Sequence, residues 1–145
     1  MAYQKQMQFD KDVENILNGI EKLKMLQELD VKLLADEGGY ADKLAQRLKS
    51  MKTTQLRRFF GAIKDIEKNL KEKGWNYVEA EFYLLKPKLA YAKGRKLIPN
   101  EFHQVVKTAM NRINVGDNKD KIENYTRFVW FLEAVVAYHK FYGGE

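Results

Sequence analysis

The chain has 145 residues, of which 45% are hydrophobic and 32% charged, with two prolines and no cysteine. This length suits one domain with a buried core, and the composition is typical of a folded helical protein. The lack of cysteine excludes disulfides, thiolate catalysis, zinc sites with thiolate ligands and iron–sulfur clusters. The start shows no signal-peptide pattern and the longest apolar run, FVWFLEAVVAY, is too short for a membrane span, so we expect a cytoplasmic protein without membrane contact.

The formal net charge of +6 is concentrated in one internal segment. Residues 53–96 contain eleven lysines and arginines and five acidic residues, whereas the rest of the chain is balanced. Because this excess is internal and does not lie in a tail, it predicts a polyanionic partner.

The first fifty residues predict helices without a distinctive motif. Apolar residues recur every three or four positions across residues 10–26, which predicts a first amphipathic helix. The two glycines of DEGGYAD interrupt this pattern, and Asp42 is expected to cap a shorter second helix.

The segment TTQLRRFFGAIKDIEKNLKEK predicts a basic helix that starts with a cap at Thr53 or Thr54 and ends at Gly74. Its apolar residues gather on one side. The opposite sector contains Arg57, Lys64, Lys68 and Lys71. Gly61 lies in the same sector, where it either allows another backbone to approach closely or has no role.

A second basic helix is predicted over about residues 76–93. Pro87 is expected to kink or break it, because proline lacks the backbone donor and clashes with the preceding turn. Gly94 is the expected C-cap. Arg95 and Lys96 follow Gly94. They either bind an anion or only stabilise the helix by interacting with the negative end of its dipole.

Residues 99–142 predict two further helices. The first is entered through Pro99 and Asn100, and the second covers about residues 119–141. Aromatic residues cover more than one face of the last helix, so it is either central to the domain or shared with a neighbouring subunit. The predicted fold is all-α, a compact single-domain bundle of about five to six helices over residues 1–145.

The residues with catalytic potential form no recognisable catalytic pattern. His103 and His139 lie on different predicted helices, and the sequence has no phosphate-binding glycine loop and no serine nucleophile motif. We therefore expect neither an enzyme nor a bound metal or cofactor.

Three blocks of sequence resemble the small subunit of type III-A CRISPR effector complexes, the Csm small subunit. They are TTQLRRFFGAI, LLKPKLAYAKGR and FLEAVVAYHKFYGG, and together they span about residues 53–144. The resemblance implies an all-helical subunit that is not the nuclease, that associates with copies of itself and with other subunits, and that lies along the guide RNA–target RNA duplex. The matching positions are Arg57, Lys86, Lys88, Tyr91 and Arg95.

The charge pattern adds further candidates for RNA contact: Lys52, Arg58, Lys64, Lys68 and Lys96. Arginine is favoured where phosphate is bound through two hydrogen bonds. Tyr91 is expected either to stack on a base or ribose or to pack in the core. We predict non-catalytic binding of the phosphate backbone without sequence specificity. The alternative is a helical adaptor that docks an acidic protein and makes its main contact through Trp130 or Phe131.

Overall fold

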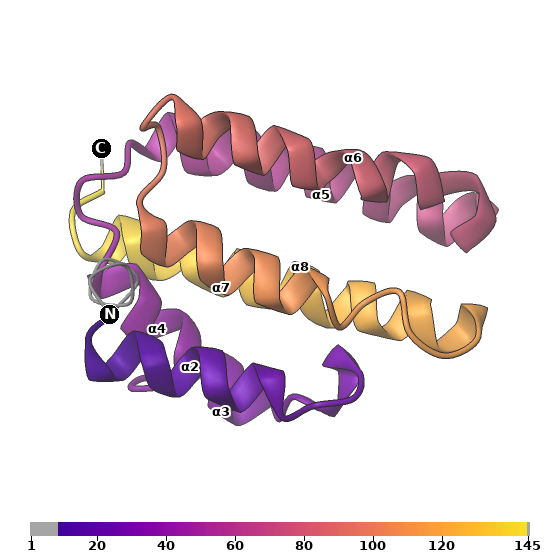
Figure 1. Ribbon diagram of the computed structural model, residues 1–145, viewed down its shortest axis with the longest axis horizontal. Coiled ribbons are helices and arrows are strands. Elements are labelled where there is room, and N and C mark those ends of the chain that lie inside the picture. The colour runs from indigo at the N-terminus through magenta and orange to yellow at the C-terminus, as the bar shows by residue number, and fades with distance from the viewer. Residues whose placement is uncertain (1–8, 145) are drawn as a thin grey trace, which may run out of the picture.

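Three layers of helices make up the computed structural model, which describes residues 9–144 (Figure 1). One outer layer is a hairpin of α5 (Thr53–Lys73) and α6 (Trp75–Gly94). The middle layer contains α7 (Asn100–Met110), which contacts α2 and α6, and α8 (Asn118–Phe141), which contacts α4 and α5. The other outer layer contains α2 (Lys11–Glu21), α3 (Val31–Ala35) and α4 (Tyr40–Gln46), with the short 3-10 helix Leu26–Glu28 between α2 and α3. Every regular element of the described residues is a helix, so the predicted all-α bundle is confirmed.

Helix α8 lies at the centre of the bundle and contacts helices of both outer layers. Tyr125, Phe128 and Leu132 are fully buried on it. The Tyr125 hydroxyl donates a hydrogen bond to the Ile63 carbonyl of α5 at 2.8 Å, and burial raises the pKa of this hydroxyl far above its usual range. Central burial therefore explains why apolar residues cover more than one face of α8.

Several helix ends differ from those expected. Helix α2 stops at Glu21, because the chain turns into the segment that packs against α8. Asp42 lies inside the first turn of α4 and accepts a hydrogen bond from the Gly38 N–H at 2.7 Å. It is therefore not the N-cap residue, although it still satisfies a backbone donor near the helix start. Lys52, and neither threonine, occupies the N-cap of α5, which has no side-chain capping bond.

The expected break at Pro87 does not occur. Helix α6 runs without interruption from Trp75 to Gly94. Leu85 and Leu89 are buried on either side of the proline. Packing of this apolar face holds the helix together, although an internal proline costs about 3 kcal/mol in an isolated helix.

The C-terminal cap of α6 also differs from the prediction. Gly94 is still helical, and the left-handed residue is Lys96, with a φ of 61°. The Leu97 N–H donates to the Ala92 carbonyl at 2.9 Å and the Lys96 N–H donates to the Lys93 carbonyl at 3.0 Å, which together form a Schellman motif. Helix α8 ends in the same motif with Gly143 in the left-handed position. None of the helices within residues 9–144 is both long enough and apolar enough to cross a membrane.

Candidate nucleic-acid interface

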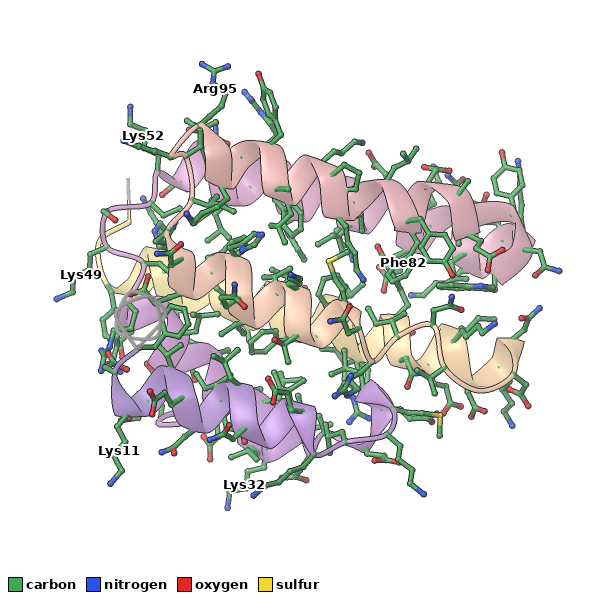
Figure 2. All side chains as sticks on the ribbon, viewed as in Figure 1. Lys11, Lys32, Lys49, Lys52, Phe82 and Arg95 are labelled. Carbon is green, nitrogen blue, oxygen red and sulfur yellow. The ribbon has the colours of Figure 1, made fainter. Side chains whose placement is uncertain are left out.

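The two ends of the α5–α6 hairpin differ sharply in charge. We call residues 52–62 and 85–96 the open end, where α5 begins and α6 finishes, and residues 63–84, around the turn at Gly74, the turn end. The turn end has four lysines and five acidic residues. The open end has no acidic residue and eight basic ones: Lys52, Arg57, Arg58, Lys86, Lys88, Lys93, Arg95 and Lys96. The charge excess of the basic segment is therefore located at the open end, where Figure 2 shows Lys52 and Arg95.

A groove of about 350 Å³ lies between α5 and α6 at the open end. We call it the α5–α6 groove. Its apolar floor is formed by Phe59, Leu85, Leu89, Leu97, Ile98 and Phe102. The rings of Phe59 and Phe102 meet edge to face, with 5.7 Å between their centroids. Its polar rim is formed by Gln55, Arg58, Lys88 and Tyr91. The structure therefore brings side chains from both basic helices together around one apolar cavity.

Tyr91 is 63% exposed at the edge of this groove, so the alternative that it packs in the core is wrong. The Arg95 guanidinium donates a hydrogen bond to the Tyr91 hydroxyl at 3.1 Å and lies 5.7 Å from the centroid of its ring. This contact fixes the tyrosine relative to a cation four residues further along the chain, at the C-cap of α6.

A second cavity, of about 280 Å³, lies where α6 passes into α7. Lys93 and Lys96 line it together with Asn100, the first residue of α7. Helix α7 has no side-chain capping bond, so the N–H groups of its first turn add positive potential to that of the two lysines. Lys93 was not among the predicted contacts, although its spacing of three residues from Lys96 was visible in the sequence.

Lys86 belongs to the opposite side of α6 from Lys88. Its ammonium donates a hydrogen bond to the Asn111 side-chain oxygen at 2.6 Å. It also lines a cavity with His103 and Lys107 of α7. Burial, Lys107 and Lys93 all lower the pKa of His103, which favours the neutral imidazole.

The predicted residues on the other flank of α5 do not join the groove. Arg57 is rotated by about 100° from Arg58 around the helix axis, away from α6. Lys64 shares its sector and donates a hydrogen bond to Glu67 at 2.8 Å, and Lys71 lies 3.6 Å from the same carboxylate. Lys68 lies on this flank as well. Arg57 and Arg95 therefore do not lie on one side of the hairpin. Of the two neighbouring arginines of α5, Arg58 is the one that lines the α5–α6 groove.

The two histidines do not form a common site. Nε2 of His139, on α8, lies 3.1 Å from the Leu48 carbonyl and 2.9 Å from the Met51 carbonyl, so this buried ring fastens α8 to the segment that precedes α5. His103 lies on α7. Within residues 9–144, no group of three or more His, Asp or Glu side chains is placed to hold a metal ion.

The fold and the site define a small all-helical protein with a candidate polyanion-binding end. The Csm2 Type III-A family model matches residues 28–145, and the chain therefore belongs to this family, the small subunits of type III-A CRISPR effector complexes. A Streptococcus thermophilus protein described as CRISPR system Cms protein Csm2 is 25% identical over 123 residues, which cover 78% of this chain and 98% of that protein. No solved structure matches the chain. The resemblance found in the three sequence blocks is confirmed.

Proposed function

We propose that this chain is a non-catalytic RNA-binding subunit of a type III-A CRISPR ribonucleoprotein in the cytoplasm. It contacts the phosphate backbone of the guide RNA and target RNA through the open end, without reading their sequence, and so serves antiviral defence. Its partners are RNA, the other subunits of the complex and further copies of itself. The observation that carries the proposal is the gathering of eight basic residues and no acidic residue at one end of a rigid helical hairpin.

Phosphate is the group that this surface suits best. Long cationic side chains on firm helices neutralise successive phosphates and release their counterions, and such contacts carry no sequence information. Arg58 and Arg95 can each bind one phosphate through two hydrogen bonds. The start of α5, which has no side-chain cap, points its positive dipole end toward the same region.

The buried polar side chains make hydrogen bonds that hold the fold together, which supports a non-catalytic role. Asp42 accepts hydrogen bonds from the Gly38 N–H and from the Tyr142 hydroxyl. Asn124 accepts from the Gln27 N–H at 2.9 Å and donates to the Ile113 carbonyl at 3.0 Å. His139 binds two backbone carbonyls. These side chains hold elements of the bundle together, and none of them belongs to the open end.

The salt dependence of binding to single-stranded RNA of arbitrary sequence tests this proposal. Four to six phosphate contacts give a slope of roughly −3 to −4 in a plot of log affinity against log salt concentration, at about −0.7 per contact. The double variant Arg58→Gln with Arg95→Gln should flatten this slope by about 1.4. Lys11→Gln with Lys32→Gln is the matched control, because both lysines lie in the opposite outer layer (Figure 2).

A wild-type slope near zero would exclude backbone binding. If the Arg58/Arg95 double variant and the Lys11/Lys32 control flatten the salt-dependence slope equally, RNA binds elsewhere or net charge alone determines its affinity. Helicity measured by circular dichroism confirms that each variant is folded.

The exposed aromatic residues of α8 favour a second role in protein contact. Trp130 is 42% exposed and lies under the Arg127 guanidinium at 5.2 Å, and Phe141 is 78% exposed. Phe131 is buried, so it belongs to the core and not to a contact surface. If the chain is an adaptor for an acidic protein, Trp130→Ala should abolish that association and RNA should not compete with it.

A further inference from the structure

We propose that the α5–α6 groove accepts one unpaired nucleobase, which stacks on Tyr91 while Arg58, Lys88 and Arg95 hold the neighbouring phosphates. This inference rests on the proposed function and goes beyond it, because backbone binding alone requires no site for a base. The groove then selects single-stranded or flipped-out nucleotides without preferring one sequence.

The apolar lining of the groove does not suit a ligand that is only a phosphate group. Its floor is apolar and includes the edge-to-face pair of Phe59 and Phe102. A phosphate placed against these rings loses hydration and gains no hydrogen bond. A flat aromatic base gains from the same surroundings, since proteins that bind unpaired bases stack them on aromatic rings and on guanidinium planes. The volume of about 350 Å³ is within the usual range of small-molecule sites.

Tyr91 has the exposure and the orientation of a stacking platform. Its ring is 63% exposed beside the groove, and its hydroxyl is held by Arg95 at 3.1 Å. The side chain is thus partly ordered before any ligand arrives, which lowers the entropic cost of stacking. The guanidinium lies over the ring, 5.7 Å from its centroid, and a single cation can cover only one of the two ring faces.

Tyr77 on the same helix provides an internal contrast. It is 53% exposed, but the Lys73 ammonium lies 4.4 Å from its ring centroid, closer than Arg95 lies to Tyr91. Tyr77 stands at the turn end, where acidic residues outnumber lysines. A tyrosine with a neighbouring cation therefore occurs at both ends of α6. Tyr91 lines the α5–α6 groove with its cationic rim, and Tyr77 does not line that groove.

The charge of the rim favours a polynucleotide over a second protein surface. Among the described residues that line the groove, Arg58 and Lys88 are charged and none is acidic. An apolar side chain from another subunit fills the floor but leaves these cations uncompensated. One nucleotide supplies both an aromatic ring and an anion. The amide of Gln55 adds one donor and one acceptor, which every base can use in some orientation.

Two RNA ligands with equal numbers of phosphates test the inference: a single-stranded oligoribonucleotide and the same oligomer made abasic. Tyr91→Ala should weaken binding of the intact oligomer about tenfold and change binding of the abasic oligomer by less than about twofold. Tyr91→Phe, which keeps the ring, should retain most of the affinity. Tyr77→Ala is the matched control and should leave both affinities unchanged. A 2-aminopurine in the intact oligomer should lose fluorescence on binding wild-type protein but not Tyr91→Ala.

The outcomes separate this inference from the proposed function. If wild-type protein binds both oligomers equally and with a steep salt dependence, backbone binding stands and the base site is wrong. If Tyr91→Ala weakens both oligomers equally, the tyrosine acts on the backbone and the base site is again wrong. If Arg58→Gln with Arg95→Gln affects neither oligomer, the proposed function fails. A change in sedimentation of Tyr91→Ala without a change in RNA affinity would make the groove a contact between copies.

Discussion

The open end and the turn end of the α5–α6 hairpin are built from the same two helices but have different electrostatic properties. At the turn end, buried Glu67 accepts a hydrogen bond from Lys64 at 2.8 Å and lies 3.6 Å from Lys71. At the open end, none of the ion pairs within residues 9–144 involves Arg58 or Arg95. The number of basic residues in a segment therefore does not locate a binding surface. The candidate surface at the open end is distinguished by the absence of acidic residues and by the apolar groove that lies between its cations.

Reversal of charge at the two ends should give the largest difference. Arg58→Glu with Arg95→Glu removes two charge-assisted contacts, each contributing about 1.5 kcal/mol or more, so RNA affinity should fall roughly 100-fold. Lys68→Glu with Lys73→Glu makes the same change in net charge at the turn end and should lower affinity less than about threefold. Fluorescence anisotropy with labelled single-stranded RNA measures both. Equal losses would mean that the ends do not differ in function.

Lys96 has a left-handed backbone, and replacing it tests whether a lysine at this position lowers the stability of the fold. Lys96→Gly should stabilise the fold by about 1 kcal/mol, because glycine adopts a positive φ without steric strain. For a chain of this size the melting temperature should rise by roughly 2–4 °C. RNA affinity should fall a few-fold through loss of the charge. Gly143→Ala, at the same position of the motif that ends α8, should have the opposite effect on stability. A drop in the melting temperature of Lys96→Gly would contradict this explanation.

Removal of the carboxylate at the turn end should have the smallest effect. Glu67→Gln keeps the side-chain volume and releases Lys64 and Lys71 from their shared ion pair. The two lysines are exposed although Glu67 is buried, and ion pairs of exposed lysines contribute about 0.2–1 kcal/mol, so RNA affinity at low salt should rise by about twofold. Isothermal titration against wild-type protein measures this change. An unchanged affinity would show that ion pairing is not what distinguishes the turn end.

Much of the fold was predictable because local patterns and tertiary packing agree. The apolar spacing of α5 and the glycine after it predicted both boundaries of that helix to within a residue. The observed boundaries of α8 also lie within a residue of the predicted range. The prediction failed where packing overrides local preference. Pro87 remains helical because buried leucines hold α6 on both sides of it, and a lysine takes the left-handed position expected near Gly94.

The candidate site was predicted less well than the fold. The sequence identifies which residues are basic and places Arg57 in a cationic sector of its own helix. It does not show which side of α5 faces α6. Because that side carries Arg58, this residue lines the same groove as Lys88 and Tyr91. The pairing of two lysines with Glu67 also depends on which side of α5 is buried.

Photo-cross-linking of single-stranded RNA to the wild-type chain, with the attachment sites mapped by mass spectrometry, shows which end of the hairpin holds the RNA. Binding at the open end predicts cross-links within residues 52–62 and 85–96, with Tyr91 the strongest. Cross-links confined to residues 63–84, or to the layer of α2, α3 and α4, would contradict it.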